Sequence, residues 1–271
     1  MSNKHIGYVI GNGSFRQIGT TSITEFANAS LIKESTSYSF KFDAFGKNNQ
    51  NDFDWIPTTG IDTDLSNVKT EFKNISFTNN NGWYNDSFRT QGKDYCLNIT
   101  GLPFSSDVLQ NSFTFEIDFY TESIHNNDDV LIDVGGFIKI YPNRASLLDR
   151  NGKAIIETNF KSDERIKISF IKYPATDTNS VWSNLFAIVT NGIMERGASS
   201  NSRPMAPSDT IKIGGADSGI RVYNIRYYTN NLDWKACYNN WIYDADNKAD
   251  IISRNSVYFT TGSDKWLGEI D

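Results

Sequence analysis

The segment FTFEIDFY, residues 113–120, alternates between apolar and mostly polar side chains. Phenylalanine or isoleucine occupies every second position, and threonine, glutamate, aspartate and tyrosine stand between them. Successive side chains of a β-strand point to opposite faces of a sheet, so a period of two is typical of a strand with one buried face. We therefore predict an antiparallel strand here, with Glu116 and Asp118 on its solvent side.

Short apolar runs with turn residues between them continue along the chain. Asn-Gly between two such runs is the strongest short hairpin signal that a sequence offers. Evenly spaced strands with turns between them are typical of a β-sandwich or jelly roll. The turns are expected at residues 135–136, 149–152, 191–192 and 214–215.

The end of this strand series predicts a strand over residues 219–228 and a helix over residues 232–243. Simple alternation in the strand places Val222 and Asn224 on one face and Tyr223 on the other. The helix follows a polar cap and has Asp233 in its first turn. We expect it to cover the last strand and to close one end of the sandwich. Its predicted apolar face consists of Leu232, Ala236, Cys237 and Trp241.

The first part of the chain has a different pattern, with short predicted strands at residues 8–10, 15–18 and 38–42. The polar run after residue 47 is typical of a boundary between domains. We predict a small β-rich segment, for which an Ig-like fold is one option, over residues 1–50. A loop or linker over 51–65 and a jelly-roll domain over 66–271 follow.

Charge and composition argue against several classes of protein. The net charge is -6 and no Lys/Arg cluster persists, which disfavours nucleic-acid binding. No apolar run is long enough to span a bilayer, and the first residues have no signal-peptide core, so we expect neither membrane insertion nor Sec export. Cys96 and Cys237 are far apart, and we expect both to be reduced and packed as small apolar groups.

Residues 112–119, 186–193 and 211–224 resemble the concanavalin A-like lectin/glucanase superfamily, in its laminin-G or pentraxin-like branch. Residues 42–49, 70–74, 81–83 and 88–89 are similar to the lead-in of tailed-bacteriophage virion proteins. The segments 238–242 and 252–255 are similar to the ends of those proteins, and the resemblance spans residues 38–257 in all.

This resemblance implies an all-β antiparallel sandwich of jelly-roll, concanavalin A-like type. It also implies a non-enzymatic fibre, baseplate or capsid-decoration protein, located in the virion and assembled in the host cytoplasm. The implied partners are other virion proteins and a host-surface glycan, with the chain in a homo-oligomer or multi-copy assembly.

Because the superfamily includes glucanases, a glycan-degrading enzyme on the same fold is the alternative. Glu116 and Asp118 share a strand face, but the next acid on that face, Glu122, is six residues beyond Glu116. That separation is roughly 20 Å at about 3.3 Å per residue. Retaining glycosidases need their two carboxyl groups about 5–5.5 Å apart. We therefore predict no catalytic residues.

Metal sites receive little support from the sequence. Residues 244–250 resemble a calcium loop, but the glycine at the sixth position and the closing glutamate are absent. Asp128 and Asp129, and also Asp62 and Asp64, fit solvated acidic loops better than ligand sets. Many lectin-like sandwiches hold calcium, yet no specific motif supports it here, and we predict no metal or other cofactor.

Carbohydrate recognition requires an aromatic platform with amide or carboxylate groups beside it. The alternative interpretation of the tryptophans is that they anchor the core or an interface. The candidate glycan- or partner-binding residues are Trp83, Tyr84, Tyr120, Asn179 and Trp182, with Asn85 and Asn184 close to them in sequence.

Overall fold

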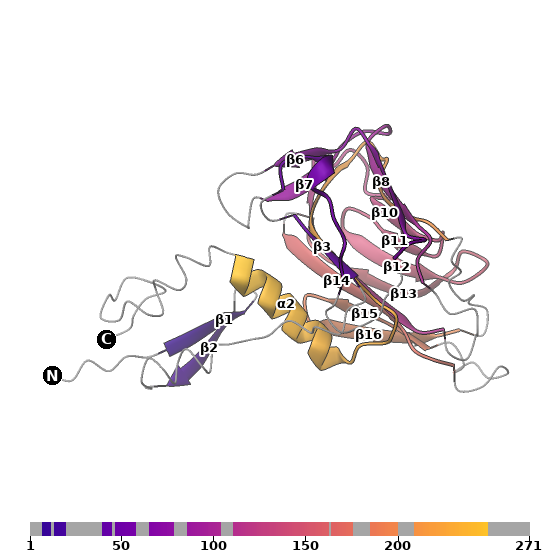
Figure 1. Ribbon diagram of the computed structural model, residues 1–271. Helices are drawn as coiled ribbons and strands as arrows, with labels where there is room; N and C mark the ends of the chain where they lie inside the picture. The colour runs from indigo at the N-terminus through magenta and orange to yellow at the C-terminus, as the bar shows by residue number, and fades with distance from the viewer. Residues whose placement is uncertain are drawn as a thin grey trace.

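The computed structural model describes most of the predicted strand series. The described residues are 7–11, 14–19, 40–44, 47–57, 65–78, 86–103, 111–162, 164–175, 185–199 and 209–248. They form two antiparallel sheets packed face to face, a separate hairpin and an α-helix (Figure 1). The predicted all-β antiparallel sandwich is thus confirmed.

The larger sheet has nine strands and contains the segment 113–122 near its centre. Its main path runs β16-β15-β14-β9-β18-β3-β4, while β7 also pairs with β18 and β6 pairs with β7. Its strands are β3 (Phe40–Asp43), β4 (Ile56–Pro57), β6 (Ser76–Thr78), β7 (Ser87–Thr90), β9 (Phe113–Glu122), β14 (Arg165–Lys172), β15 (Leu185–Thr190), β16 (Ile193–Ala198) and β18 (Gly219–Tyr228).

The second sheet has seven strands in the order β13-β12-β11-β10-β17-β8-β5. A short 3-10 helix, η1 (Gln50–Asp52), lies between β3 and β4. The strands of this sheet are β5 (Lys69–Lys73), β8 (Cys96–Thr100), β10 (Ile132–Val134), β11 (Ile138–Ile140), β12 (Arg144–Leu148), β13 (Ala154–Asn159) and β17 (Ile211–Gly214).

The core lies between the two sheets, where the apolar positions of each strand meet. Phe115, Ile117 and Phe119 of β9 are buried there with Ile168 and Phe170 of the neighbouring β14. The period of two in residues 113–120 therefore predicted correctly which side chains of β9 face the core.

The Asn191-Gly192 turn between β15 and β16 has the conformation that its sequence predicts. Asn191 has a φ of 46° and Gly192 a φ of 81°, and both central residues of a type I′ turn need positive values. Gly192 also lies against the helix, because a Cβ on it would be 2.8 Å from the rings of Trp241 and Tyr238. This hairpin and the helix therefore fit against each other closely.

The start of the sandwich differs from the predicted division of the chain. β3 and β4 fall inside the ranges predicted as N-terminal segment and linker, yet both are strands of the nine-stranded sheet. Phe53 and Trp55, from the predicted linker, pack against the core. β1 (Gly7–Gly11) and β2 (Ser14–Gly19) form a two-stranded sheet of their own, and β1 lies against the helix.

The edge strands of the two sheets are short, carry exposed charges, or pack against an edge strand of the other sheet. β4 ends at Pro57 and β6 has three residues, while β5 exposes Lys69, Glu71 and Lys73. At the opposite side of the sandwich, β13 and β16 meet. A Cβ on Gly197 would lie 2.6 Å from the Cγ1 of Ile156.

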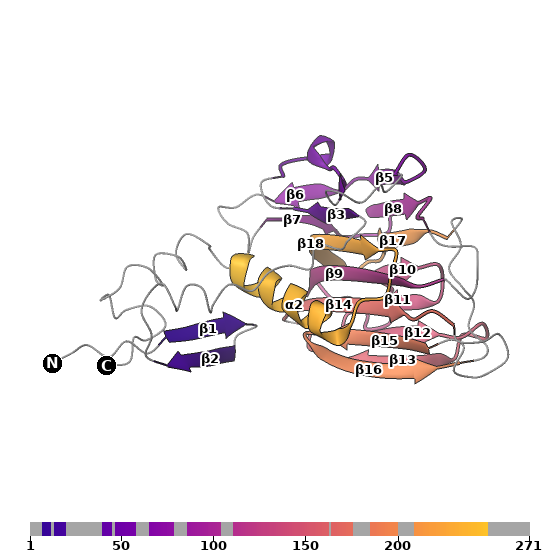
Figure 2. The same cartoon turned by 60° about the horizontal axis from the view of Figure 1, so that its bottom comes forward.

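Helix α2 (Trp234–Lys248) lies across the outer face of the nine-stranded sheet (Figure 2). The prediction that it closes one end of the sandwich is wrong, although it does cover the last strand as expected. The prediction failed because the buried side of the helix is not the purely apolar face that was expected. The residues that face the sheet include two polar ones, Asn240 and Asp244, beside Cys237 and Trp241. No helix in the described part of the chain has the length and apolar content that crossing a membrane requires.

Candidate functional site

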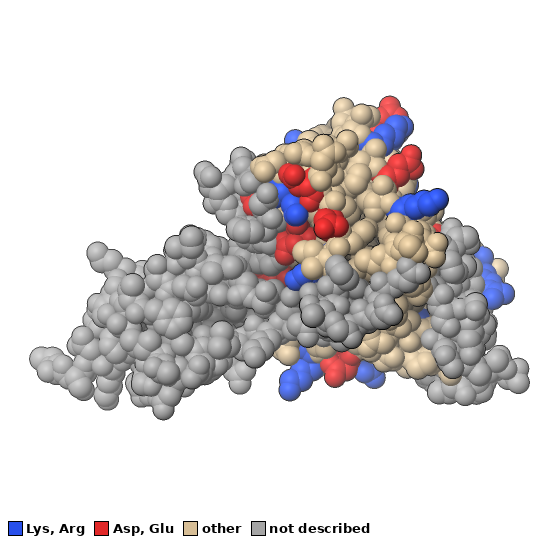
Figure 3. Space-filling model, in the orientation of Figure 1, with Lys and Arg blue, Asp and Glu red and all other residues tan. Residues whose placement is uncertain are grey.

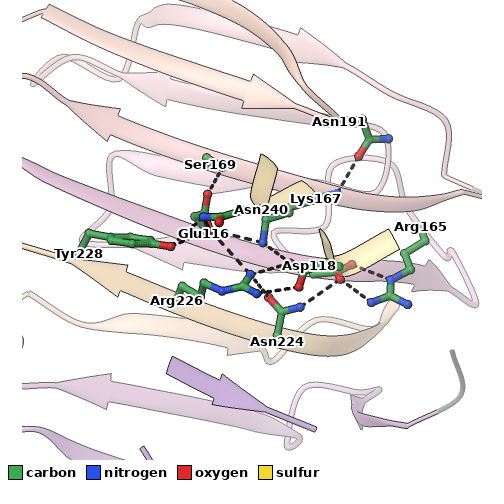
Figure 4. Close-up of polar contacts among 11 residues, drawn as sticks. Glu116, Asp118, Arg165, Lys167, Ser169, Asn191, Asn224, Arg226, Tyr228 and Asn240 are labelled. Atoms are coloured by element: carbon green, nitrogen blue, oxygen red, sulfur yellow. Dashed lines mark hydrogen bonds and ion pairs between the residues drawn. The ribbon is translucent and has the colours of Figure 1, made fainter. Parts of the chain in front are cut away.

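A strip of polar side chains runs over the outer face of the nine-stranded sheet, under α2 (Figure 4). Glu116 and Asp118 of β9 belong to it and are 0% and 2% exposed. The prediction that they lie on the solvent side is therefore wrong, because α2 covers the face to which they point. The neighbouring strands contribute Lys167, Ser169, Asn224, Arg226 and Tyr228.

Glu116 is enclosed by hydrogen-bond donors from both the sheet and the helix. Ser169 Oγ donates to one carboxylate oxygen at 2.8 Å, and Asn240 Nδ2 donates to the other at 2.9 Å. The Lys167 ammonium lies 3.5 Å from the second oxygen. Since every contact holds Glu116 inside the protein, its carboxylate cannot reach an external substrate in this arrangement.

Asp244 of α2 carries the charge that joins the helix to the sheet. Its Oδ2 lies 2.7 Å from Lys167 Nζ and 2.6 Å from one terminal nitrogen of Arg226, and its Oδ1 lies 2.7 Å from the other. Asp244 therefore accepts a bidentate arginine contact, which is the strong geometry for a carboxylate. In sequence, residues 244–250 resemble a calcium loop, but Asp244 lies in α2 and is 1% exposed.

A β-bulge in β18 sets the next part of the strip. Val222 pairs with Phe119, and Asn224 pairs with Asp118, the next residue of β9, so one extra residue stands on β18. Val222 therefore points to the core while Asn224 points outward and donates to Asp118 at 3.2 Å. The prediction that Val222 and Asn224 share a face is wrong, because the bulge at Tyr223 shifts the alternation.

Arg165 lies at the end of the covered strip. It makes two hydrogen bonds to Asp118, and its guanidinium lies 3.9 Å from the centre of the Tyr223 ring. Burial alone would lower the pKa of Arg165, but the adjacent Asp118 charge and its hydrogen bonds outweigh burial and raise that pKa. Three acidic side chains thus meet three basic ones under α2: Glu116, Asp118 and Asp244 with Arg165, Lys167 and Arg226.

The strip continues into a more open part of the same face. Tyr120 of β9 pairs in register with Arg165 on one side and with Arg221 on the other, and Arg221 pairs with Arg89 of β7. We call Arg89, Tyr120, Glu122 and Arg221 the Tyr120 row. Arg221 lies on the strand next to Tyr120 and Arg89 one strand further, at a spacing of about 4.8 Å per strand.

Glu122 forms ion pairs with both arginines of the row. It contacts Arg221 Nε at 2.6 Å and also forms an ion pair with Arg89, which donates to Gln91 at 2.6 Å. The Arg89 and Arg221 side chains are 35% and 27% exposed. Two positive charges against one negative charge leave the row with a formal charge of plus one. Arg221 donates to Glu122 through its Nε.

Of the residues predicted to bind a glycan or partner, Tyr120 lies in this row and is half-buried. Trp83, Tyr84, Asn179 and Trp182 lie outside the described residues, as do Asn85 and Asn184. Sequence reasoning missed the arginines, because each stands alone in its own strand and only the register brings them together. An arginine between apolar residues on a strand, as in Ile220-Arg221-Val222, is the signal that could have indicated them.

Asp128 and Asp129, which were candidates for a solvated acidic loop, both contact the protein itself. Asp129 accepts a hydrogen bond from the Ser218 backbone at 2.9 Å, and Asp128 forms an ion pair with Arg144 at 2.9 Å. Among the described residues, no three histidine, cysteine or acidic side chains are grouped so as to hold a metal ion. Cys96 and Cys237 are both buried and unpaired, as predicted. Figure 3 shows acidic and basic side chains interspersed over the described surface that it presents.

Comparison with known proteins shows the fold alone. No protein-family model matches the chain, and no curated protein matches its sequence. The Botulinum Neurotoxin Type G receptor binding domain has a TM-score of 0.50 at 14% identity, covering 76% of this chain and 51% of that one. The binding domain of Paraclostridial Mosquitocidal Protein 1 has a TM-score of 0.51 at 14% identity, covering 76% and 52%.

A third solved structure, the binding domain of Botulinum Neurotoxin DC in complex with SialylT, has a TM-score of 0.51 at 15% identity. It is matched over 76% of this chain and 51% of its own. The chain therefore spans about half the length of the solved structures that it resembles. Their sandwich architecture supports the fold described above, while the assignment to the concanavalin A-like superfamily stays a prediction.

Proposed function

We propose that this chain is a non-enzymatic binding module that recognises a surface glycan through the outer face of its nine-stranded sheet. The observation that carries the proposal is the Tyr120 row, where an aromatic ring lies in register beside Arg221. Aromatic rings pack against the apolar faces of sugar rings, and arginine and carboxylate groups bind hydroxyl and acidic substituents. A few fixed polar groups around such a platform give a binding site its specificity.

Two further observations support this proposal. The similar solved structures are named as binding domains, and one of them is in complex with SialylT. In addition, Glu116 and Asp118, the carboxylates that a glucanase-like reaction would use, are enclosed beneath α2. A glycan at the Tyr120 row would therefore contact binding groups rather than reacting ones.

A glycan array with labelled protein tests the proposal. We expect a defined set of glycans to bind, and Arg221→Ala or Tyr120→Ala to weaken that binding by about tenfold or more, as central contacts of an interface do. Arg144→Ala is the matched control, since Arg144 is likewise a partly exposed arginine paired with an acidic side chain, Asp128, but lies on the other sheet. Equal losses in all three variants, or no glycan bound by the wild type, would contradict the proposal.

The enzymatic alternative has its own test. Incubation with β-glucans, followed by an assay of new reducing ends, is expected to give no product with the wild type. Product that disappears in Glu116→Gln would overturn the non-enzymatic proposal, because it would show that the enclosed carboxylate reaches a substrate.

We also propose that the module serves in a tailed-phage virion, as a fibre, baseplate or capsid-decoration component present in several copies. The support is the resemblance of residues 42–49, 70–74, 81–83 and 88–89 to the lead-in of such proteins. Immunogold labelling of purified particles with an antibody to this chain tests the proposal. Gold at regular positions on particles is the expected result, and particles free of label would contradict it.

A further inference from the structure

We propose that Lys167 and Arg226 form a carboxylate-binding subsite of the same outer face, and that Asp244 of α2 occupies it in cis in competition with a ligand carboxylate. The inference rests on the proposed function, because the ligand reaches the subsite from the Tyr120 row. The chemistry of the site indicates the class of ligand: a glycan that bears a carboxylate.

The geometry at Asp244 is that of a receptor with its ligand bound. Both terminal nitrogens of Arg226 donate to the carboxylate, and Lys167 Nζ adds a third contact to Oδ2. The two cationic side chains are 1% and 2% exposed while Asp244 is in place. A planar guanidinium and an ammonium that converge on one point select a carboxylate over neutral groups.

The charges under α2 balance only when the helix is in place. The sheet contributes two acids, Glu116 and Asp118, and three bases. Asp244 is the one described charge of this strip that comes from the helix. Without α2 the sheet face has a formal charge of plus one, which one carboxylate neutralises. Its bases are Arg165, Lys167 and Arg226.

The composition of the covered face also indicates that the face serves in an uncovered state. A sheet face that is permanently packed under a helix is normally apolar. Here the apolar part of the contact between α2 and the sheet, which includes Ile171, Val189 and Cys237, lies at the first half of α2. The second half is held by polar contacts of Asn240 and Asp244. Among the described side chains of that half, Trp241 is the one buried apolar group that separation from the sheet would expose.

The subsite is continuous with the Tyr120 row through hydrogen bonds. Arg226 donates to Asn224 at 3.1 Å, Asn224 donates to Asp118, and Asp118 accepts from Arg165, which pairs in register with Tyr120. A ligand seated on Tyr120 thus lies on the same face and one connected network away from Arg226. Its carboxylate would take the position that Asp244 occupies.

Chemical rescue of Asp244→Ala with formate tests the subsite directly. Thermal unfolding is followed in sodium formate and in sodium chloride of equal ionic strength. We expect the variant to have a lower Tm than the wild type and formate to restore part of the difference, while chloride does not. Asp233→Ala is the matched control, because Asp233 caps the same helix through the Ala236 backbone and stands outside the strip. Rescue that is absent, or equal in both variants, would overturn the proposal.

Hydrogen exchange on the wild-type protein tests displacement and does not depend on a variant that folds. Formate, compared with chloride, is expected to speed exchange of the backbone amides in the second half of α2 by about threefold or more, with β9 and β14 unchanged. Unchanged exchange in α2 would overturn the competition that we propose. If no glycan binds on the array but formate rescues Asp244→Ala and speeds exchange in α2, the proposed function is contradicted and the carboxylate subsite is supported. If glycans bind but formate has neither effect, the subsite is contradicted and glycan binding is supported.

Discussion

Arg165 and Asp118 form a bidentate pair across β14 and β9, with Arg165 Nε 2.8 Å from Asp118 Oδ1. Their side chains are 10% and 3% exposed, so neither charge is solvated by bulk water. A pair in this position is weak support for the stability of the fold but costly to break, because removal of one partner leaves the other charge buried alone.

Asp118→Asn is therefore expected to lower the free energy of unfolding by about 3–5 kcal/mol, measured by urea denaturation. Asp94→Asn is the matched control, since Asp94 pairs with Lys73 at 2.9 Å on the exposed surface. We expect that change to leave the unfolding midpoint where it is. Equal midpoint shifts in the two variants would show that burial of the Arg165 pair has no special cost.

Lys172 gives the protein a pH dependence of defined sign. It is 1% exposed, and burial lowers its pKa from 10.5 to about 8. Between these two values the unfolded chain binds the proton more tightly than the folded one, so this group makes stability rise with pH across the window. Below about 8 the folded protein bears the full cost of a buried charge.

Lys172→Met isolates this contribution. Comparison with the wild type is needed because burial raises the pKa values of Cys237, Tyr173 and Tyr227, which makes stability fall as the pH rises further. We expect the variant to be more stable than the wild type below pH 8, with a smaller advantage as the pH approaches 10.5. Urea denaturation across this range measures the difference, and an advantage that is constant with pH would refute the assignment.

Alanine substitutions at Gly192 and Gly152 distinguish the cost of backbone strain from the cost of a steric clash between side chains. Both have a positive φ, 81° and 79°, but a Cβ on Gly192 meets two aromatic rings at 2.8 Å, whereas Gly152 has nothing within 4 Å. Gly152→Ala is expected to lower the free energy of unfolding by about 1–2 kcal/mol through the left-handed conformation alone. Gly192→Ala should cost about 1–3 kcal/mol more from overpacking. Equal costs in urea denaturation would show that α2 yields freely at this turn.

The two thiols should be protected from alkylating reagents in the native state. Cys96 and Cys237 are 6% and 1% exposed, and burial raises the pKa of the Cys237 thiol, which reduces the reactive thiolate. We expect alkylation followed by mass spectrometry to modify Cys237 only when the protein is unfolded in urea. Modification of native Cys237 at the rate of a free thiol would indicate that α2 leaves the sheet readily over its first half.

The sequence predicted the sandwich because local patterns are sufficient for it. Alternation in residues 113–120 identifies the core face of β9, and Asn191-Gly192 fixes a hairpin without any information on distant contacts. The bulge at Tyr223 was not predictable in this way, because alternation assumes a regular strand. The position of α2 also escaped prediction, since Asn240 and Asp244 belong to its buried face only once charged partners on the sheet are known.

The candidate site was predictable only in part. Tyr120 was identified as an aromatic residue on the polar face of a strand, and the structure places it beside Arg221. The charged strip was interpreted as a solvated face because nothing local indicates that a helix from another part of the chain covers it. Pairing across β14, β9, β18 and β7 depends on tertiary register, which a single sequence does not specify.

The guarded edges of the two sheets limit how copies of this chain can join one another. Edge strands normally invite pairing with a neighbouring molecule, but here the described edges are interrupted by proline, very short, charged or packed against each other. Continuation of a sheet from one molecule into the next is therefore obstructed at each of these strands. Copies joined at places other than these edges would leave each sandwich an independently folding unit.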